Sequence, residues 1–224
     1  MGNITIKKVE TKSEMKKFIR FNYELYKDNQ YSVPDIYEDM LETFSDKNAA
    51  MEFCEAIYFL AYKDGKVVGR VAGIIHNKAN KTWNLNAVRF GWIDFIDDPE
   101  VSRALIEAVE EWGRSKGKTE IQGPLGFTDL DAEGMLIEGF EELSTMATIY
   151  NYPYYPKHIE ALDWMGQDTK AKAQEKLAAF TVKIGYPNKW KDYSTLTVDP
   201  SKSYWANVVE ANRWYTADEM SQVG

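Results

Sequence analysis

The chain has 224 residues, of which 44% are hydrophobic and 28% are charged, and its formal net charge is −8. This length suits one large domain, or one domain with an appended piece. The negative charge comes without any basic stripe, which argues against a nucleic-acid partner and against binding to an anionic membrane.

Cysteine usage and the N-terminal residues indicate an intracellular protein without disulfides. Cys54 is the only cysteine, so an intramolecular disulfide and a Cys-rich zinc site are both excluded. The first residues contain no apolar segment of the signal-peptide type, and no uninterrupted apolar run approaches ~20 residues. We therefore expect a cytoplasmic protein in which Cys54 is a small buried side chain.

The first elements along the chain are a strand and two helices. Residues 4–10 alternate apolar and polar side chains, as a strand exposed on one face does. Residues 12–27 place apolar side chains near helical spacing, with Ser13 as the expected N-cap. A second helix is expected to begin after Pro34.

The middle of the chain reads as strands with one long helix. Residues 55–77 predict a β-hairpin, because Asp-Gly at 64–65 is a strong turn signal between apolar runs. A strand over 87–98 is followed by an amphipathic helix over 99–117, and then by a strand over 119–127. This order predicts an α/β (α+β) fold with a mixed sheet flanked by helices.

Residues 4 to about 157 resemble the GNAT superfamily of N-acetyltransferases. The resemblance is carried by FGWIDFIDDPEVSRALIEAVEEWGRSKG, the Gly-Pro that follows it, the EGM and EGF turns, and the closing Tyr-Asn and Tyr-Tyr pairs. It implies a GNAT-like domain over residues 1–158 that transfers an acyl group from acetyl-CoA, or another acyl-CoA, to the amine of a small molecule or peptide.

The resemblance also implies where the chemistry would lie. In that superfamily the acyl-CoA occupies a split between two parallel strands, and its pyrophosphate meets the N-terminus of the following helix. The cofactor-binding residues carried over in this way are Ile93, Asp94, Phe95 and Arg103. The catalytic candidates are Tyr155, as general acid to the leaving thiolate, with Tyr154 and Glu138.

The loop before the predicted 99–117 helix keeps a second interpretation open. It reads IDDPEVS, with no Gly and no Arg, and it brings Asp97, Asp98 and Glu100 to the place where phosphates would lie. Acidic residues are also the ordinary choice for stabilising a helix start. The alternative is therefore a non-catalytic binding or structural module with the same fold.

From Ile159 onward the sequence resembles an interior stretch of the neprilysin-like zinc metallopeptidases, peptidase family M13. The resemblance rests on the segments LDWM, TKAKA and KIGYP and on a later helix that contains Asn. The HExxH motif that holds zinc in that family is absent, so we expect no zinc and no peptidase role for residues 159–224.

The two resemblances meet near His158 and Ile159, within a predicted helix over 158–178. A later strand pattern over 180–187 could pair with the sheet edge that the GNAT-like part leaves open. A final amphipathic helix is expected over 203–220. The sequence leaves the oligomeric state open.

Overall fold

The computed structural model describes residues 3–146, 148–161 and 191–221. The chain divides into two compact units, Met1–Ala173 and Gln174–Gly224, which are called the N-terminal and C-terminal units below and are described separately. The predicted domain boundary at 158/159 falls inside one helix, α5 (Tyr154–Ala161), and remains a prediction.

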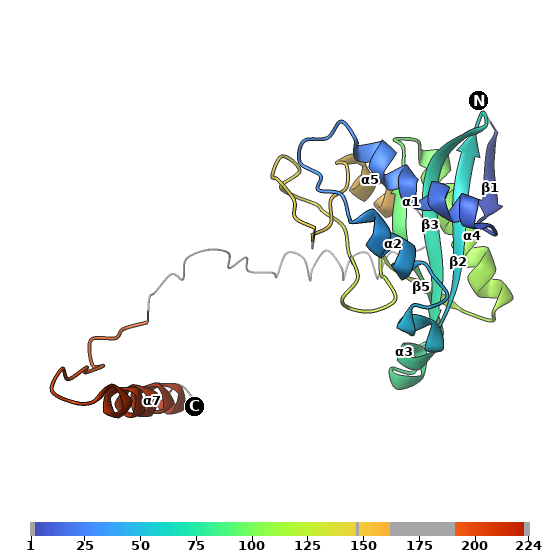
Figure 1. Ribbon diagram of the computed structural model, residues 1–224. Coiled ribbons are helices and arrows are strands. Elements are labelled where there is room, and N and C mark those ends of the chain that lie inside the picture. The colour runs from blue at the N-terminus through green and yellow to red at the C-terminus, as the bar shows by residue number, and fades with distance from the viewer. Residues whose placement is uncertain (1–2, 147, 162–190, 222–224) are drawn as a thin grey trace. The chain divides into compact units, whose positions relative to one another are not determined.

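A five-stranded sheet forms the centre of the N-terminal unit (Figure 1). Its strands lie in the order β1-β2-β3-β4-β5; the first four are antiparallel neighbours, and β4 and β5 are parallel. The predicted mixed sheet is thereby confirmed. The bounds are β1 Ile4–Lys8, β2 Cys54–Lys63, β3 Lys66–His76, β4 Ala87–Phe95 and β5 Glu120–Gln122.

The predicted hairpin is formed by β2 and β3. Its two turn residues, Asp64 and Gly65, both have positive φ, at 50° and 78°. Such a turn matches the right-handed twist of the paired strands, and Asp-Gly suits it because Asp tolerates this region and glycine has no Cβ. Cys54 begins β2 and is buried as expected, and this burial raises the pKa of its thiol to about 11.

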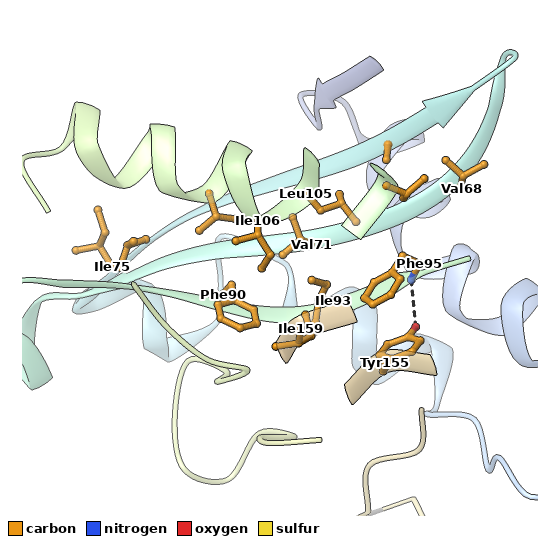
Figure 2. Packing of buried hydrophobic residues seen from close by; sticks show 14 residues of the cluster. Val68, Val71, Ile75, Phe90, Ile93, Phe95, Leu105, Ile106, Tyr155 and Ile159 are labelled. Atoms are coloured by element: carbon orange, nitrogen blue, oxygen red, sulfur yellow. Dashed lines mark hydrogen bonds between the residues drawn. The ribbon is translucent and has the colours of Figure 1, made fainter. Parts of the chain in front are cut away.

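Helices cover both faces of the sheet. α1 (Lys12–Tyr26) packs Phe18 and Ile19 against Leu60 and Ala72 on one face. α4 (Pro99–Ser115) covers the other face with residues four apart on its buried stripe (Figures 1 and 2). Three shorter elements complete this part: α2 Tyr37–Thr43, the 3₁₀ turn Ala49–Glu52, and α3 Asn77–Thr82, of which α3 and the 3₁₀ turn were not predicted.

The start of α1 corrects one prediction. Thr11, not Ser13, is the N-cap: its Oγ1 accepts the Glu14 N–H at 3.2 Å, and Glu14 Oε2 accepts the Thr11 N–H at 3.0 Å. This reciprocal pair satisfies two backbone donors at once, whereas a cap at Ser13 would leave that exchange unmade.

A β-bulge interrupts β4. Two of its residues, Trp92 and Ile93, lie opposite the single residue Val71 of β3, and Trp92 has a φ of 44°. The extra residue shifts the alternation of side chains between the two faces. As a result Asp94 lies directly opposite Arg70, on the face covered by α1 rather than on the apolar face covered by α4.

β4 runs on past the end of its pairing with the parallel strand β5. Pairing joins only Ala87–Arg89 to Glu120–Gln122, while β4 continues to Phe95. The chain then runs through 123–153, whose described residues contain no helix or strand, and returns in α5. Tyr155 of α5 stacks on Phe95 with ring centroids 4.2 Å apart, which closes the core on this side (Figure 2).

In the C-terminal unit the described residues form a loop and α7 (Tyr204–Ser221), so the last predicted helix is present, but its apolar side chains are spread around it rather than gathered on one face as predicted. None of the α7 side chains is fully buried. The rest of the predicted 158–178 helix beyond Ala161, and the predicted 180–187 strand, lie outside the described residues.

Candidate active site

A cavity of about 310 Å³ lies beside the bulge of β4, where β4 and β5 separate. Its walls come from α1, the α1–α2 connection, α2, β3, β4, the segment 123–153 and α5. Clefts beside a split between parallel strands are common ligand sites in open α/β sheets. We take this cavity as the candidate active site.

Asp94 stands in the wall of the cavity at the centre of a hydrogen-bond network. Its Oδ2 accepts from Arg70 Nε at 2.7 Å and from Asn22 Nδ2 at 3.1 Å. Its Oδ1 lies 3.2 Å from the Tyr155 hydroxyl and 3.3 Å from that of Tyr26. Both Arg70 and Asp94 are buried, so the network compensates a charge pair that water hardly reaches.

The two tyrosines of this network are held in the protonated form. Burial, followed by the negative charge of Asp94, raises the pKa of Tyr26 and of Tyr155 well above 10. The Tyr155 hydroxyl also accepts the backbone N–H of Phe95 at 3.1 Å (Figure 2). Tyr155 therefore fixes the end of β4 as well as facing the cavity.

Two further carboxylates line the cavity, Asp35 from the α1–α2 connection and Asp131 from the segment 123–153. Together with Asp94, and counting only the described residues of the cavity wall, they set three acidic side chains against the guanidinium of Arg70, a formal balance of −2 when all are ionised. Burial is the main cause that raises the pKa of Asp35, and Arg70 opposes it. The cavity also has apolar walls, from Met40, Trp92, Ile93, Leu130, Met135, Met146 and Ile149.

The structure brings together only some of the residues predicted for the site. Ile93, Asp94 and Tyr155 line the same cavity. Phe95 is fully buried, and Tyr154 donates its hydroxyl to the Phe95 carbonyl at 2.6 Å; neither residue is among those that line the cavity.

Arg103 and Glu138 lie elsewhere. Arg103 is exposed on α4 and borders a shallow groove beside β1. Glu138 is exposed in the segment 123–153 and is not among the residues that line the cavity.

The first turn of α4 is closed by its own residues. Asp98 caps it: its Oδ1 accepts the Glu100 N–H at 3.0 Å, and its carbonyl accepts the N–H groups of Val101 at 3.0 Å and Ser102 at 3.3 Å. Pro99 has no N–H. These are the backbone donors that a pyrophosphate would need at a helix start, and each one present is already engaged.

The acidic side chains beside this turn have cationic or polar partners. Lys63 Nζ lies 2.6 Å from Asp98 Oδ2, a contact that lowers the pKa of Asp98. The ring of His158, on α5, lies 2.9 Å from Asp97 Oδ1 through Nε2 and 3.2 Å from Ser102 Oγ through Nδ1. The loop is thus tied to both β2 and α5, so His158 has a structural role here.

The residues that sequence reasoning missed include Asn22, Tyr26, Asp35, Arg70 and Asp131. Arg70 carried a signal, because a charge inside an otherwise apolar strand indicates a buried partner. Asn22 and Tyr26 follow Phe18 at intervals of four on the buried face of α1, which is also informative. Asp35 is one of several acidic residues in its segment, and no local pattern distinguishes it.

Among the described residues, no three His, Cys, Asp or Glu side chains are grouped closely enough to hold a metal ion. The three carboxylates of the cavity are therefore separate rather than one ligand set. Within the same residues, no helix has both the length and the apolar character needed to cross a bilayer.

Two parts of the chain are similar to different proteins. Protein YghO of Escherichia coli is 33% identical over 153 residues, which are 68% of this chain and 39% of that protein. The bacterial ceramide synthase of Caulobacter vibrioides is 28% identical over 142 residues, which are 62% of this chain and 37% of that protein. This chain thus spans about two fifths of the length of both.

The later part resembles metallopeptidases, as predicted. Residues 154–187 match the N-terminal part of peptidase family M13. The neutral endopeptidase of Lactobacillus helveticus is 38% identical over 72 residues, which are 30% of this chain but only 11% of that protein. The family match begins inside α5, a helix whose Tyr155 and Ile159 belong to the core of the N-terminal unit.

Solved structures similar to this chain include acetyltransferases of the GNAT type. A tandem GNAT protein from the clavulanic acid biosynthesis pathway gives a TM-score of 0.43 at 14% identity, covering 53% of this chain and 35% of that one. An aminoglycoside acetyltransferase from an uncultured soil metagenomic sample gives 0.39 at 12% identity, covering 84% of this chain and 97% of that one.

Proposed function

We propose that the N-terminal unit is an N-acyltransferase domain, and that its central cavity holds the amine that receives the acyl group. The observation that carries this proposal is the charge of the cavity, where three carboxylates face one guanidinium. Such a balance favours a cation over an anion. The apolar walls suit a primary amine that also carries a hydrocarbon part.

The residues of this chain would first hold the charged form of the amine. Asp94, fixed by donors from Arg70 and Asn22, supplies a negative charge that does not move when the ligand enters. An ammonium must then lose a proton before its nitrogen can attack an acyl carbon. The similarity to a ceramide synthase supports this reaction type, because ceramide is a long-chain amine with an acyl group in amide linkage.

The acyl donor implied by the GNAT resemblance is acyl-CoA. The residues at the first turn of α4 do not fit its pyrophosphate, because Asp98 engages the backbone donors there and three acidic side chains stand beside them. The first turn of α4 therefore does not serve as a pyrophosphate site, and acyl-CoA is proposed as the donor only from the resemblance.

A second function is favoured by that same closed turn. A GNAT-like module that binds an amine without transferring an acyl group would keep the cavity and have no need of free donors at α4. This chain spans about two fifths of the length of its first relatives, and with this second function the acyl-transfer step belongs to other parts of those longer proteins.

Both functions are tested with octylamine and its uncharged counterpart octanol. Calorimetry on the full chain should show saturable binding of octylamine that octanol does not reproduce. Incubation with acetyl-CoA and octylamine should then yield N-octylacetamide above the enzyme-free rate, measured by mass spectrometry. Binding without amide would support the non-catalytic module, and equal binding of the amine and the alcohol would overturn both.

A further inference from the structure

The three carboxylates of the cavity differ in what already binds them. Asp94 is surrounded by four donor groups, among them Arg70 and Tyr155. Asp131 Oδ2 accepts the backbone N–H of Thr128 at 2.8 Å and lies 3.3 Å from its hydroxyl. The Asp35 side chain makes no hydrogen bond or ion pair with any residue that the structure describes.

Asp35 is nevertheless held in place. Its backbone carbonyl accepts the Tyr23 hydroxyl at 2.9 Å, which ties the α1–α2 connection to α1. The side chain is half-buried and lines the cavity, so an incoming ligand can reach it. A positioned carboxylate with unused acceptor oxygens is what a proton acceptor requires.

The charges that face Asp35 come from every element around it. Among the described residues, the charges that act on Asp35 are the cation Arg70 on β3 and the acids Asp94 on β4 and Asp39 on α2. Tyr23 on α1 and Asp131 in the segment 123–153 also border this region. Burial, and then the two neighbouring acids, raise the pKa of Asp35 more than Arg70 lowers it. A raised pKa makes the carboxylate a better base at neutral pH.

We propose that Asp35 takes the proton from the ammonium of the amine held in the cavity. The inference rests on the proposed function. In this step one N–H bond of the ammonium breaks and an O–H bond forms on Asp35, while the electron pair stays on nitrogen and makes it nucleophilic. Asp94, already saturated by its donors, keeps its position and contributes a fixed charge.

The test is the formation of N-octylacetamide from acetyl-CoA and octylamine by the full chain and two variants. Asp35→Asn removes the carboxylate that would take up the proton but keeps the side-chain shape, and we expect kcat to fall by about 10²–10⁴-fold. The wild-type kcat should decline as the pH is lowered through the pKa of Asp35, and the variant should lack this acidic limb. Asp28→Asn is the matched control, since Asp28 is exposed, does not line the cavity and is not among the charges that act on Asp35, and it should keep the wild-type rate.

Stability separates this role from a structural one. Because the folded state raises the pKa of this acid, the folded state binds the proton more tightly than the unfolded chain, and stability falls as the pH rises through that window. Asp35→Asn should therefore be at least as stable as the wild type at pH 7, and the difference should vanish below about pH 4.

The outcomes distinguish the two proposals. A variant that loses kcat and the acidic limb supports the inference. Amide formation by wild type and Asp35→Asn with equal kcat and equal pH profiles leaves the proposed function standing and overturns the role of Asp35. A rise in KM with unchanged kcat also overturns it, because Asp35 would then only bind the cation. Absence of amide from the wild type overturns the proposed function, and this role with it.

Discussion

The N-terminal and C-terminal units each contain an ion pair of the same length. Arg70 Nε and Asp94 Oδ2 are 2.7 Å apart in the first, and Lys191 Nζ and Asp218 Oδ2 are 2.7 Å apart in the second. The side chains of the first pair are 4% and 8% exposed, and those of the second are 33% and 26% exposed. Distance alone therefore does not tell which contact supports a fold, and burial has to be considered with it.

The same contrast holds for two long helices. α4 has 17 residues and buries a stripe against the sheet, whereas α7 has 18 residues and buries none. α7 is held by local contacts such as Trp214 Nε1 to Thr195 Oγ1 at 2.8 Å and the stacking of Tyr193 on Trp214. The two helices are similar in length, but the apolar side chains of α4 gather on one face, whereas those of α7 are spread around the helix and form no single apolar face.

The largest expected effect separates the two ion pairs. Arg70→Ala should lower the free energy of unfolding by about 3–5 kcal/mol, because it leaves the buried Asp94 without its counter-charge. Lys191→Ala should cost about 1 kcal/mol or less, since water can replace the lost partner. Urea unfolding followed by circular dichroism measures both. Equal losses would show that burial does not distinguish the pairs.

A second comparison sets one apolar side chain of each helix against the other. Leu105→Ala in α4 should cost about 2–5 kcal/mol, because this side chain is fully buried and its removal leaves a cavity. Trp205→Ala in α7 should change stability by no more than about 0.5 kcal/mol, since this side chain is 71% exposed. The same urea titration applies, and a costly Trp205→Ala would mean that α7 packs against a surface in solution.

Sequence patterns predicted best what depends on neighbours in the chain. The Asp64-Gly65 turn and the buried stripe of α4 follow from local residue types and spacing, and both are present. The bulge at Trp92 is different. It places Asp94 opposite Arg70, a residue 24 positions earlier, and no local rule fixes that register.

The candidate site was predicted in part for the same reason. Ile93, Asp94 and Tyr155 came from a family resemblance, and they line one cavity. Asp35 could not be found, because its special property is the set of charges brought near it by β3, β4 and α2. Arg103 is predicted at the cofactor because it lies on the helix that follows β4; its side chain is exposed and does not line this cavity, and its role stays a prediction.

The smallest effect concerns an exposed position in the N-terminal unit. It tests whether the N-cap hydrogen bond of α1 contributes to the free energy of unfolding. Thr11→Ala should cost about 1 kcal/mol, because it removes the side-chain oxygen that accepts the Glu14 N–H. Ser13→Ala should be neutral or slightly stabilising, since this residue lies inside the helix, where alanine is preferred. The two substituted residues are two positions apart and both exposed, so a loss of stability at Thr11 without one at Ser13 is attributed to the lost cap. A larger loss at Ser13 would place the N-cap of α1 at Ser13, two residues after Thr11, in solution.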